Sequence, residues 1–135
     1  MIKLEGGGNI IAPFFMEFTE KHIKNIFSGI EAFNSCKYDR AHECWEKVWK
    51  DLRDDDRRII LKPFIQLSGA YLNCLQKKNE AAIYLIEKSK TNILKYQSAL
   101  DQIILSDALI SDIDLLLRKK LTVKVFNQLQ IKKAG

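Results

Sequence analysis

The residues whose types could do chemistry lie together in one stretch, residues 38–49. This stretch contains one of the two histidines of the chain, His42, together with both tryptophans and the closely spaced Glu43 and Glu46. A histidine and a glutamate four positions apart on a helix can share a metal ion, because their side chains converge on one face. Two neighbouring carboxyl groups can also form an acid/base pair. Neither pattern is specific to one reaction.

A helix over residues 39–51, with Asp39 as its N-cap, would position these groups. Its apolar stripe would consist of Ala41, Cys44, Trp45, Val48 and Leu52. His42, Glu46 and Trp49 would form an adjoining strip, because positions i, i+4 and i+7 stack on one face. The polar groups would therefore lie at the edge of the buried face. Three interpretations follow: a hydrogen-bonded brace between helices, a site for a small polar ligand, and a metal site.

The metal interpretation lacks ligands. A zinc-protease helix would carry a second histidine where this chain has Glu46. The remaining histidine, His22, is expected at the surface near the start of an earlier helix. We therefore predict no tightly bound metal, and the sequence names no cofactor.

Composition predicts an all-α fold. Of 135 residues, 47% are hydrophobic and 29% charged, as in ordinary globular proteins. Two prolines and six glycines, three of them in Gly6-Gly7-Gly8, leave little turn chemistry for a β protein. We predict a single compact bundle of five to six helices over residues 19–135, preceded by an N-terminal arm over residues 1–18.

The net charge of +5 permits an acidic partner but does not require one. The basic residues are spread along the helices, with small clusters at Lys77-Lys78, Arg118-Lys119-Lys120 and Lys132-Lys133. A solvated face is the preferred interpretation. No basic strip interleaved with aromatic residues is visible, which argues against nucleic acid as a partner.

The cysteines and the apolar runs indicate the compartment. Cys36, Cys44 and Cys74 are odd in number and have no C-x-x-C spacing, so we read them as reduced, buried thiols in a cytoplasmic protein. The apolar run of residues 10–16 is broken by Pro13 and is too short to span a bilayer. We predict no membrane association.

The other helices follow from apolar periodicity and caps. We expect one from the cap Thr19 to about residue 34, one over residues 56–77 with Pro63 as a kink or first-turn residue, and one over residues 80–97 capped by Asn79. A fifth should begin after Ser106 or Ser111 and end near residue 121, and a short sixth should cover residues 123–131. The aspartates of residues 54–56 are expected at a helix start.

The helix over residues 56–77 carries the expected second wall of the site. Small residues, among them Ser68 and Gly69, would let a neighbouring helix approach closely. Gln66 and Asn73 are seven positions apart and so share a face; if buried, these amides need partners. We predict that they face the glutamate and histidine side chains across a polar pocket. The predicted pocket residues are Tyr38, His42, Glu43, Glu46, Trp49, Gln66 and Asn73.

The first hairpin resembles one tetratricopeptide unit. That repeat carries small and aromatic packing residues where this chain has Tyr38, Ala41, Trp45 and Val48, and Cys36 stands at the position of its turn glycine. Since one unit alone is recognisable and arrays need about three, the resemblance implies a tetratricopeptide-like helical hairpin and not a solenoid.

A longer resemblance, from about residue 27 to residue 96, is to the DUF309 family of small helical proteins. The residues that carry it are Phe33-Asn34, Tyr38, the run His42-Glu43-Cys44-Trp45-Glu46-Lys47-Val48-Trp49, Ile65-Gln66, Gly69-Ala70-Tyr71 and Asn79. Where the family often has a histidine, this chain has Asn73, which further argues against a metal; where the family often has Gly-Ala, it has Ala81-Ala82. The resemblance implies an all-α fold with the motif helix central, and it implies no activity.

Three function classes remain open. The polar pocket would bind a small polar ligand or a side chain of a partner protein. Alternatively, Glu43 or Glu46 would act as base and His42 as acid or ligand in a hydrolase. In the third reading the polar residues are a satisfied network inside a structural module. Access of His42 and Glu46 to solvent separates these readings, because an enzyme needs an opening.

The two ends of the chain suggest association. The arm carries Ile10, Ile11, Phe14 and Phe15, and the tail carries Val123, Val125, Phe126, Leu129 and Ile131. Exposed apolar patches often mark interfaces, so a homodimer is one expectation. The alternative is that both ends fold back on their own subunit.

Overall fold

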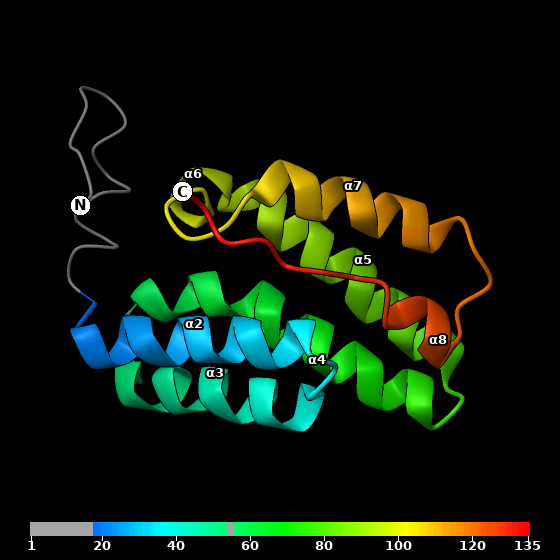
Figure 1. Cartoon of the computed structure of the whole chain (residues 1–135), viewed down its shortest axis with the longest axis horizontal. Helices are drawn as coiled ribbons and strands as arrows, with labels where there is room; N and C mark the ends of the chain where they lie inside the picture. The colour runs from blue at the N-terminus through cyan, green and yellow to red at the C-terminus, as the bar shows by residue number, and fades with distance from the viewer. Residues whose placement is uncertain (1–17, 54–55) are drawn as a thin grey trace.

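The computed structural model describes residues 18–53 and 56–135, and its helices are labelled in Figure 1. Within these residues the elements are α2 (Glu20–Asn34), α3 (Tyr38–Leu52), the 3-10 helix η2 (Asp56–Leu61), α4 (Lys62–Leu75), α5 (Asn79–Lys95), α6 (Gln97–Leu100), α7 (Ser106–Leu117) and α8 (Val123–Phe126). The predicted all-α class is confirmed. The five long helices supply the bundle, and α6 and α8 are single turns.

The hairpin of α2 and α3 is closed by a C-terminal cap built from backbone hydrogen bonds. Lys37 N–H donates to the Ala32 carbonyl (2.8 Å) and Cys36 N–H to the Phe33 carbonyl (3.0 Å). Cys36 adopts a left-handed conformation with φ of 61°. These are the two bonds of a Schellman cap, in which the position of Cys36 is usually a glycine. The chain can therefore reverse in three residues.

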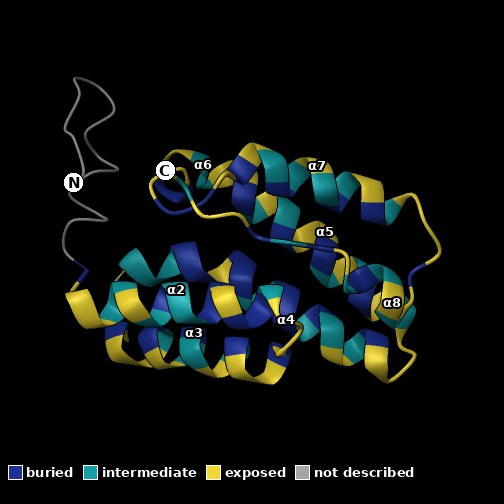
Figure 2. Cartoon of the chain, in the orientation of Figure 1, coloured by how far each residue is buried: buried dark blue, intermediate teal, exposed yellow. Residues whose placement is uncertain are grey.

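The hairpin of α4 and α5 is closed in the same way. Lys78 N–H donates to the Asn73 carbonyl (2.8 Å) and Lys77 N–H to the Cys74 carbonyl (3.0 Å), with Lys77 at φ of 62°. The chain thus consists of two helical hairpins with the same turn, followed by α6, α7 and α8. α3 packs against both α2 and α4, and α5 packs against α4 and α7. Figure 2 shows buried residues on the inward sides of these helices and exposed residues on their outward sides.

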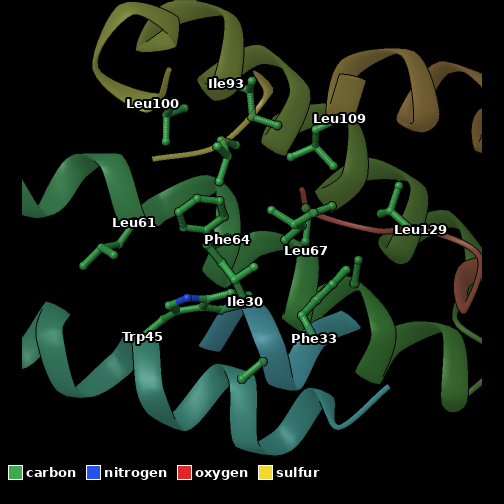
Figure 3. Packing of buried hydrophobic residues seen from close by; sticks show 14 of the residues in the cluster. Ile30, Phe33, Trp45, Leu61, Phe64, Leu67, Ile93, Leu100, Leu109 and Leu129 are labelled. Atoms are coloured by element: carbon green, nitrogen blue, oxygen red, sulfur yellow. The ribbon is translucent and has the colours of Figure 1, made fainter. Parts of the chain in front are cut away.

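Trp45 of α3 is the largest fully buried side chain among the described residues, and Figure 3 shows it beside Ile30 and Phe64. Its indole N–H donates to the Ile26 carbonyl over 3.1 Å. Its ring stacks on Phe64 of α4 at 5.2 Å between centroids. Gly29 makes this possible, because a Cβ at that position would lie 2.4 Å from the indole nitrogen. A glycine in α2 therefore admits the large ring of α3 against the helix backbone.

The caps were predicted in part. Thr19 caps α2 as expected, and its hydroxyl accepts from His22 N–H at 3.1 Å. His22, expected at the surface, is largely covered: its Nδ1 accepts from Thr19 N–H and its Nε2 lies 3.6 Å from an Asp51 carboxylate oxygen. Asp39 is not the cap of α3, since Lys37 takes that position and Asp39 lies in the first turn. A carboxylate there still interacts favourably with the positive end of the helix dipole.

Pro63 divides the helix predicted over residues 56–77. η2 ends at Leu61, and Pro63 lies in the first turn of α4. Proline is tolerated there because its missing N–H would have no partner in the helix. Asn79 and Ser106, expected as caps, are instead the first residues of α5 and α7.

The C-terminal tail folds back on its own chain, which is one of the two alternatives that the sequence left open. After α8 the chain is extended, and Phe126, Leu129 and Ile131 are buried. The amide of Asn34 both donates to the Ile131 carbonyl and accepts from Ile131 N–H, each at 2.7 Å. Figure 1 shows this segment running back along the bundle towards α6, where Ile104 and Lys133 form an isolated antiparallel bridge.

The predicted homodimer therefore has no support from the tail and stays a prediction that depends on the arm. The arm lies outside the described residues, except that Phe18, placed in it by the sequence, is buried in the core.

The cysteines differ in exposure. Cys74 is buried, Cys44 is half-buried and Cys36 is exposed at its turn, which corrects the expectation that all three are buried. Burial raises the pKa of the Cys74 thiol. Among the described helices, none has the length and apolarity needed to cross a membrane.

Candidate functional site

The predicted polar group lies on the outward side of α3. We call this side the exposed strip of α3, and it comprises His42, Glu46, Trp49 and Lys50. His42 Nε2 lies 3.6 Å from a Glu46 carboxylate oxygen, and the other Glu46 oxygen lies 3.7 Å from Lys50 Nζ. The three residues follow one another at intervals of one turn, which is why they share a face. The side chains of His42 and Glu46 are 34% and 35% exposed. They are therefore accessible to solvent and are not a network sealed inside the core.

The other side of the His42 ring is fixed by α4. Its Nδ1 lies 2.6 Å from Ser68 Oγ, and the Ser68 hydroxyl donates to the Ile65 carbonyl at 2.9 Å. Because the hydroxyl proton is used on that carbonyl, Ser68 accepts from an Nδ1–H of His42 in this arrangement. Nε2 is then the ring nitrogen that faces Glu46. A part-buried hydrogen bond thus sets the orientation of the imidazole, whose other edge is accessible to solvent.

Ser68 was not among the predicted site residues, because the sequence presents it only as a small residue that allows close helix packing. The sequence did offer one indication: Ser68 is two positions from Gln66, so the two side chains point to different faces of the helix. Ser68 is 1% exposed. The order Ser68–His42–Glu46 contains the side-chain types of a hydrolytic triad, but a serine oxygen buried to this extent cannot reach a substrate. Its role is to orient His42.

Two open hollows lie along this strip. One has a volume of about 380 Å³ and is lined by His42, Glu43, Glu46, Lys47 and Lys50. Glu43 is exposed at its rim. The hollow therefore offers both charge signs to a bound group.

The second hollow has a volume of about 520 Å³ and shares Glu46 and Lys50 with the first. Its other lining residues are Trp49, Arg53 and Arg58. The Arg58 guanidinium lies over the Trp49 ring, 4.3 Å from the ring centre. A cation over an indole is an attractive arrangement, and it presents a flat aromatic and guanidinium surface next to the polar group. Arg53 and Arg58 were not predicted, since the sequence places them in and after the turn that ends α3.

Gln66 and Asn73 lie on another face of α4, although the sequence predicted that they face His42. Asn92 of α5 donates to the Gln66 side-chain oxygen at 2.9 Å, and Asn73 donates to the Gly69 carbonyl at 3.1 Å. The two amides do share a face, as expected. Ser68 is two positions from Gln66, which on a helix turns its side chain about 200° away. The face that meets α3 is therefore the one opposite the amides.

Tyr38 is also separate from the strip. Its ring is buried, stacks on Tyr71 at 4.2 Å and meets Phe126 edge-on at 5.3 Å, while its hydroxyl donates to the Asn127 side-chain oxygen at 3.0 Å. Burial, with added contributions from Cys36 and Tyr71, raises the pKa of Tyr38 well above its usual value of 10.0. Tyr38 thus joins α3 to the tail and does not line the hollows.

No group of three or more potential ligands among the described histidine, cysteine and acidic side chains is arranged to hold a metal ion. His42 and Glu46 together supply at most two metal ligands. The absence of a bound metal stays a prediction.

Comparison with known proteins gives one match. Residues 26–85 match the family model described as "Domain of unknown function (DUF309)". This segment begins within α2, includes α3, η2 and α4, and ends within α5, so it contains the whole exposed strip of α3 and both hairpin turns. No curated protein and no solved structure matches the chain. The DUF309 resemblance predicted from the sequence is therefore confirmed over residues 26–85.

Proposed function

We propose that this chain is a binding module that recognises a partner protein through the exposed strip of α3. The observation that carries the proposal is the pair of Trp49 and Arg58, stacked at 4.3 Å at the edge of an open hollow. Tryptophan and arginine are the residue types that most often dominate the affinity of protein interfaces. Arg58 forms no ion pair with any residue that the structure describes. Its N–H groups remain available to a partner.

The adjoining hollow would supply specificity. His42 is oriented by Ser68, and Glu46 lies 3.6 Å from His42 and 3.7 Å from Lys50, so the imidazole is positioned beside a carboxylate before a partner arrives. Pre-positioned polar groups lower the entropy cost of binding. Both hollows are wide and open, whereas sites for small molecules enclose most of their ligand. This favours a side chain of a protein partner over a free small polar ligand.

Binding is also better supported than hydrolysis. A hydrolase would need an accessible nucleophile or an activated water in an enclosed site. Ser68 is buried, and the carboxylates of Glu43 and Glu46 lie on an open surface. Glu46 is further engaged by two cationic or ionisable neighbours. These features favour recognition of a charged surface.

The proposal can be tested by photo-crosslinking in cells. A photo-reactive amino acid would replace Lys50, which contributes to both hollows, and in a control protein it would replace Lys95 at the far end of α5. The expected result is a discrete protein adduct from position 50 and none of the same mass from position 95.

Matched arginine variants then test the contact. Arg58→Gln is expected to reduce the adduct at least about tenfold, the size of effect associated with a hot-spot residue. Arg40→Gln changes an exposed arginine of α3 that lines neither of the two hollows, and it should leave the adduct unchanged. An adduct that survives Arg58→Gln would contradict the proposal. So would an adduct of small-molecule mass, which would favour the polar-ligand interpretation.

A further inference from the structure

Two basic clusters that are distant in sequence meet at one end of the molecule. Lys77 and Lys78 form the turn between α4 and α5, and the second cluster follows α7. Asn79 donates a hydrogen bond to the Leu121 carbonyl at 3.2 Å, which ties the two segments together. Figure 1 shows the α4–α5 turn, the α7–α8 connection and α8 at the same end of the bundle, on the right. The basic end, as we call it, comprises Lys77, Lys78, Arg118, Lys119, Lys120 and Lys124.

All six of these side chains are exposed, and none forms an ion pair within the described residues. Lys119 donates only to the neutral amide of Gln128, at 3.2 Å. Elsewhere in the described part of the chain, three lysines do pair with carboxylates: Lys50 with Glu46, Lys133 with Glu31, and Lys90 with Asp114 at 2.6 Å. Six exposed cationic side chains therefore gather at one end of a chain whose net charge is +5.

A small hollow with both apolar and polar lining residues lies beside these charges, between α7 and α8. It has a volume of about 120 Å³, and its lining consists of Asp112, Leu115, Leu116, Lys119, Val125, Gln128 and Leu129. Leu115 is 52% exposed at its rim. The hollow is of a size to accept one aliphatic side chain. Lys119 belongs to both the hollow and the basic end, so an apolar group and a negative charge could be bound side by side.

We propose that the basic end binds an acidic segment of a partner protein, with one apolar side chain in the hollow and carboxylates against Lys119, Lys120 and Lys124. Charge complementarity selects an anionic partner and accelerates its approach. The hollow selects a protein over a nucleic acid, because its leucine and valine walls provide no aromatic face on which a base could stack. This surface is distinct from the α3 strip and does not depend on it.

Fluorescence anisotropy with defined probes tests the proposal. The first probe is a labelled peptide of aspartates and glutamates around a central leucine. The second has serine in place of the leucine, and the third is an oligouridine of the same length. The leucine peptide is expected to bind about tenfold more tightly than the serine peptide, which corresponds to burying one aliphatic side chain. Equal affinity for the two peptides, stronger binding of the oligouridine, or no binding of the leucine peptide would each overturn the proposal.

Paired variants assign the effect to this surface. Lys119→Glu combined with Lys120→Glu should abolish binding of the leucine peptide, whereas Lys88→Glu combined with Lys95→Glu on α5 makes the same charge change elsewhere and should retain it. Leu115→Ser should remove the preference for leucine, and Leu94→Ser, at a position 50% exposed, should not. If the two double-lysine variants lost equal affinity for the leucine peptide, net charge alone would attract the peptide, and the proposed binding site would be wrong. Arg58→Gln should leave peptide binding unchanged, so failure here is separable from failure at the α3 strip.

Discussion

When a side chain is removed, the loss of folding stability depends on whether its hydrogen-bond partner keeps another partner. His42 is the clearest case in this protein. We expect His42→Ala to lower the free energy of unfolding by about 0.5–1.5 kcal/mol, the net contribution of one hydrogen bond. The loss stays small because Ser68 keeps its bond to the Ile65 carbonyl and is not left without a partner. The sequence alone predicts a larger loss of stability, because it suggests that His42→Ala would leave a buried Gln66 or Glu46 without a partner.

Urea denaturation of the variant and the parent would measure this loss. Glu46→Gln serves as the control and should change stability little, since ion pairs between exposed side chains contribute little. A loss well above 3 kcal/mol for His42→Ala would indicate a buried network and contradict the exposed strip.

A second residue-scale prediction concerns alkaline pH and Tyr38. Its pKa in the folded chain is raised, so above pH 10 the unfolded chain releases this proton while the folded chain retains it. Stability contributed by the neutral phenol is therefore present below pH 10 and falls as pH rises, by up to about 1.4 kcal/mol per pH unit. Tyr38→Phe should lose about 1 kcal/mol at neutral pH, with the bond to Asn127, yet should decline less steeply between pH 10 and 11.

Chemical denaturation of both proteins across this pH range gives the comparison. Parallel alkaline declines would show that Tyr38 ionises in the folded chain and would contradict its burial.

At the scale of the elements, the two hairpin turns hold lysine and cysteine where glycine is usual. A left-handed conformation costs a residue with a side chain about 1–2 kcal/mol, and glycine loses about 0.5–1 kcal/mol more entropy on folding than other residues. We therefore expect Lys77→Gly to raise the free energy of unfolding by about 0.5–1 kcal/mol. Lys77 is exposed, so no packing is lost.

Gln76→Gly is the matched control for this prediction. Gln76 precedes Lys77 and has a φ of −85°, so glycine there brings only the entropy cost and should destabilise by about 0.5–1 kcal/mol. Thermal melts of the two variants should shift in opposite directions. A decrease in both would mean that the turn at Lys77 carries no strain to relieve.

Local periodicity explains which parts of the elements could be predicted. The strip of His42, Glu46 and Trp49 follows from one helix alone, so the sequence suffices to place it. The partners of Gln66 and Asn73 depend on which face of α4 meets α3, and apolar residues on several sides of α4 leave that orientation open. The tetratricopeptide-like character of the first hairpin also stays a prediction, although both hairpins have the same cap.

At the scale of the whole molecule, the contacts least accessible from sequence are those that join its ends. The apolar residues of the tail left open whether the tail is exposed or folds back on its own chain, because nothing in their spacing indicates Asn34 as a partner. Asn34 and Ile131 are 97 positions apart. Fold class depends on composition and repeated local patterns. The position of the tail depends instead on contacts between residues distant in sequence: the hydrogen bonds of Asn34, the Ile104–Lys133 bridge and a few apolar side chains.

The packing of the C-terminal segment on α2 also has a consequence during translation, because the two segments are made at different times. A ribosome makes α2, α3 and α4 before α8, and Phe126 of α8 covers the aromatic group of Phe33, Tyr38 and Tyr71. The segment that matches DUF309 therefore emerges from the ribosome with this aromatic surface uncovered. Until Phe126 has been made and has packed, that surface is open to chaperones and to neighbouring nascent chains. A chain that stopped before Phe126 would leave it uncovered permanently.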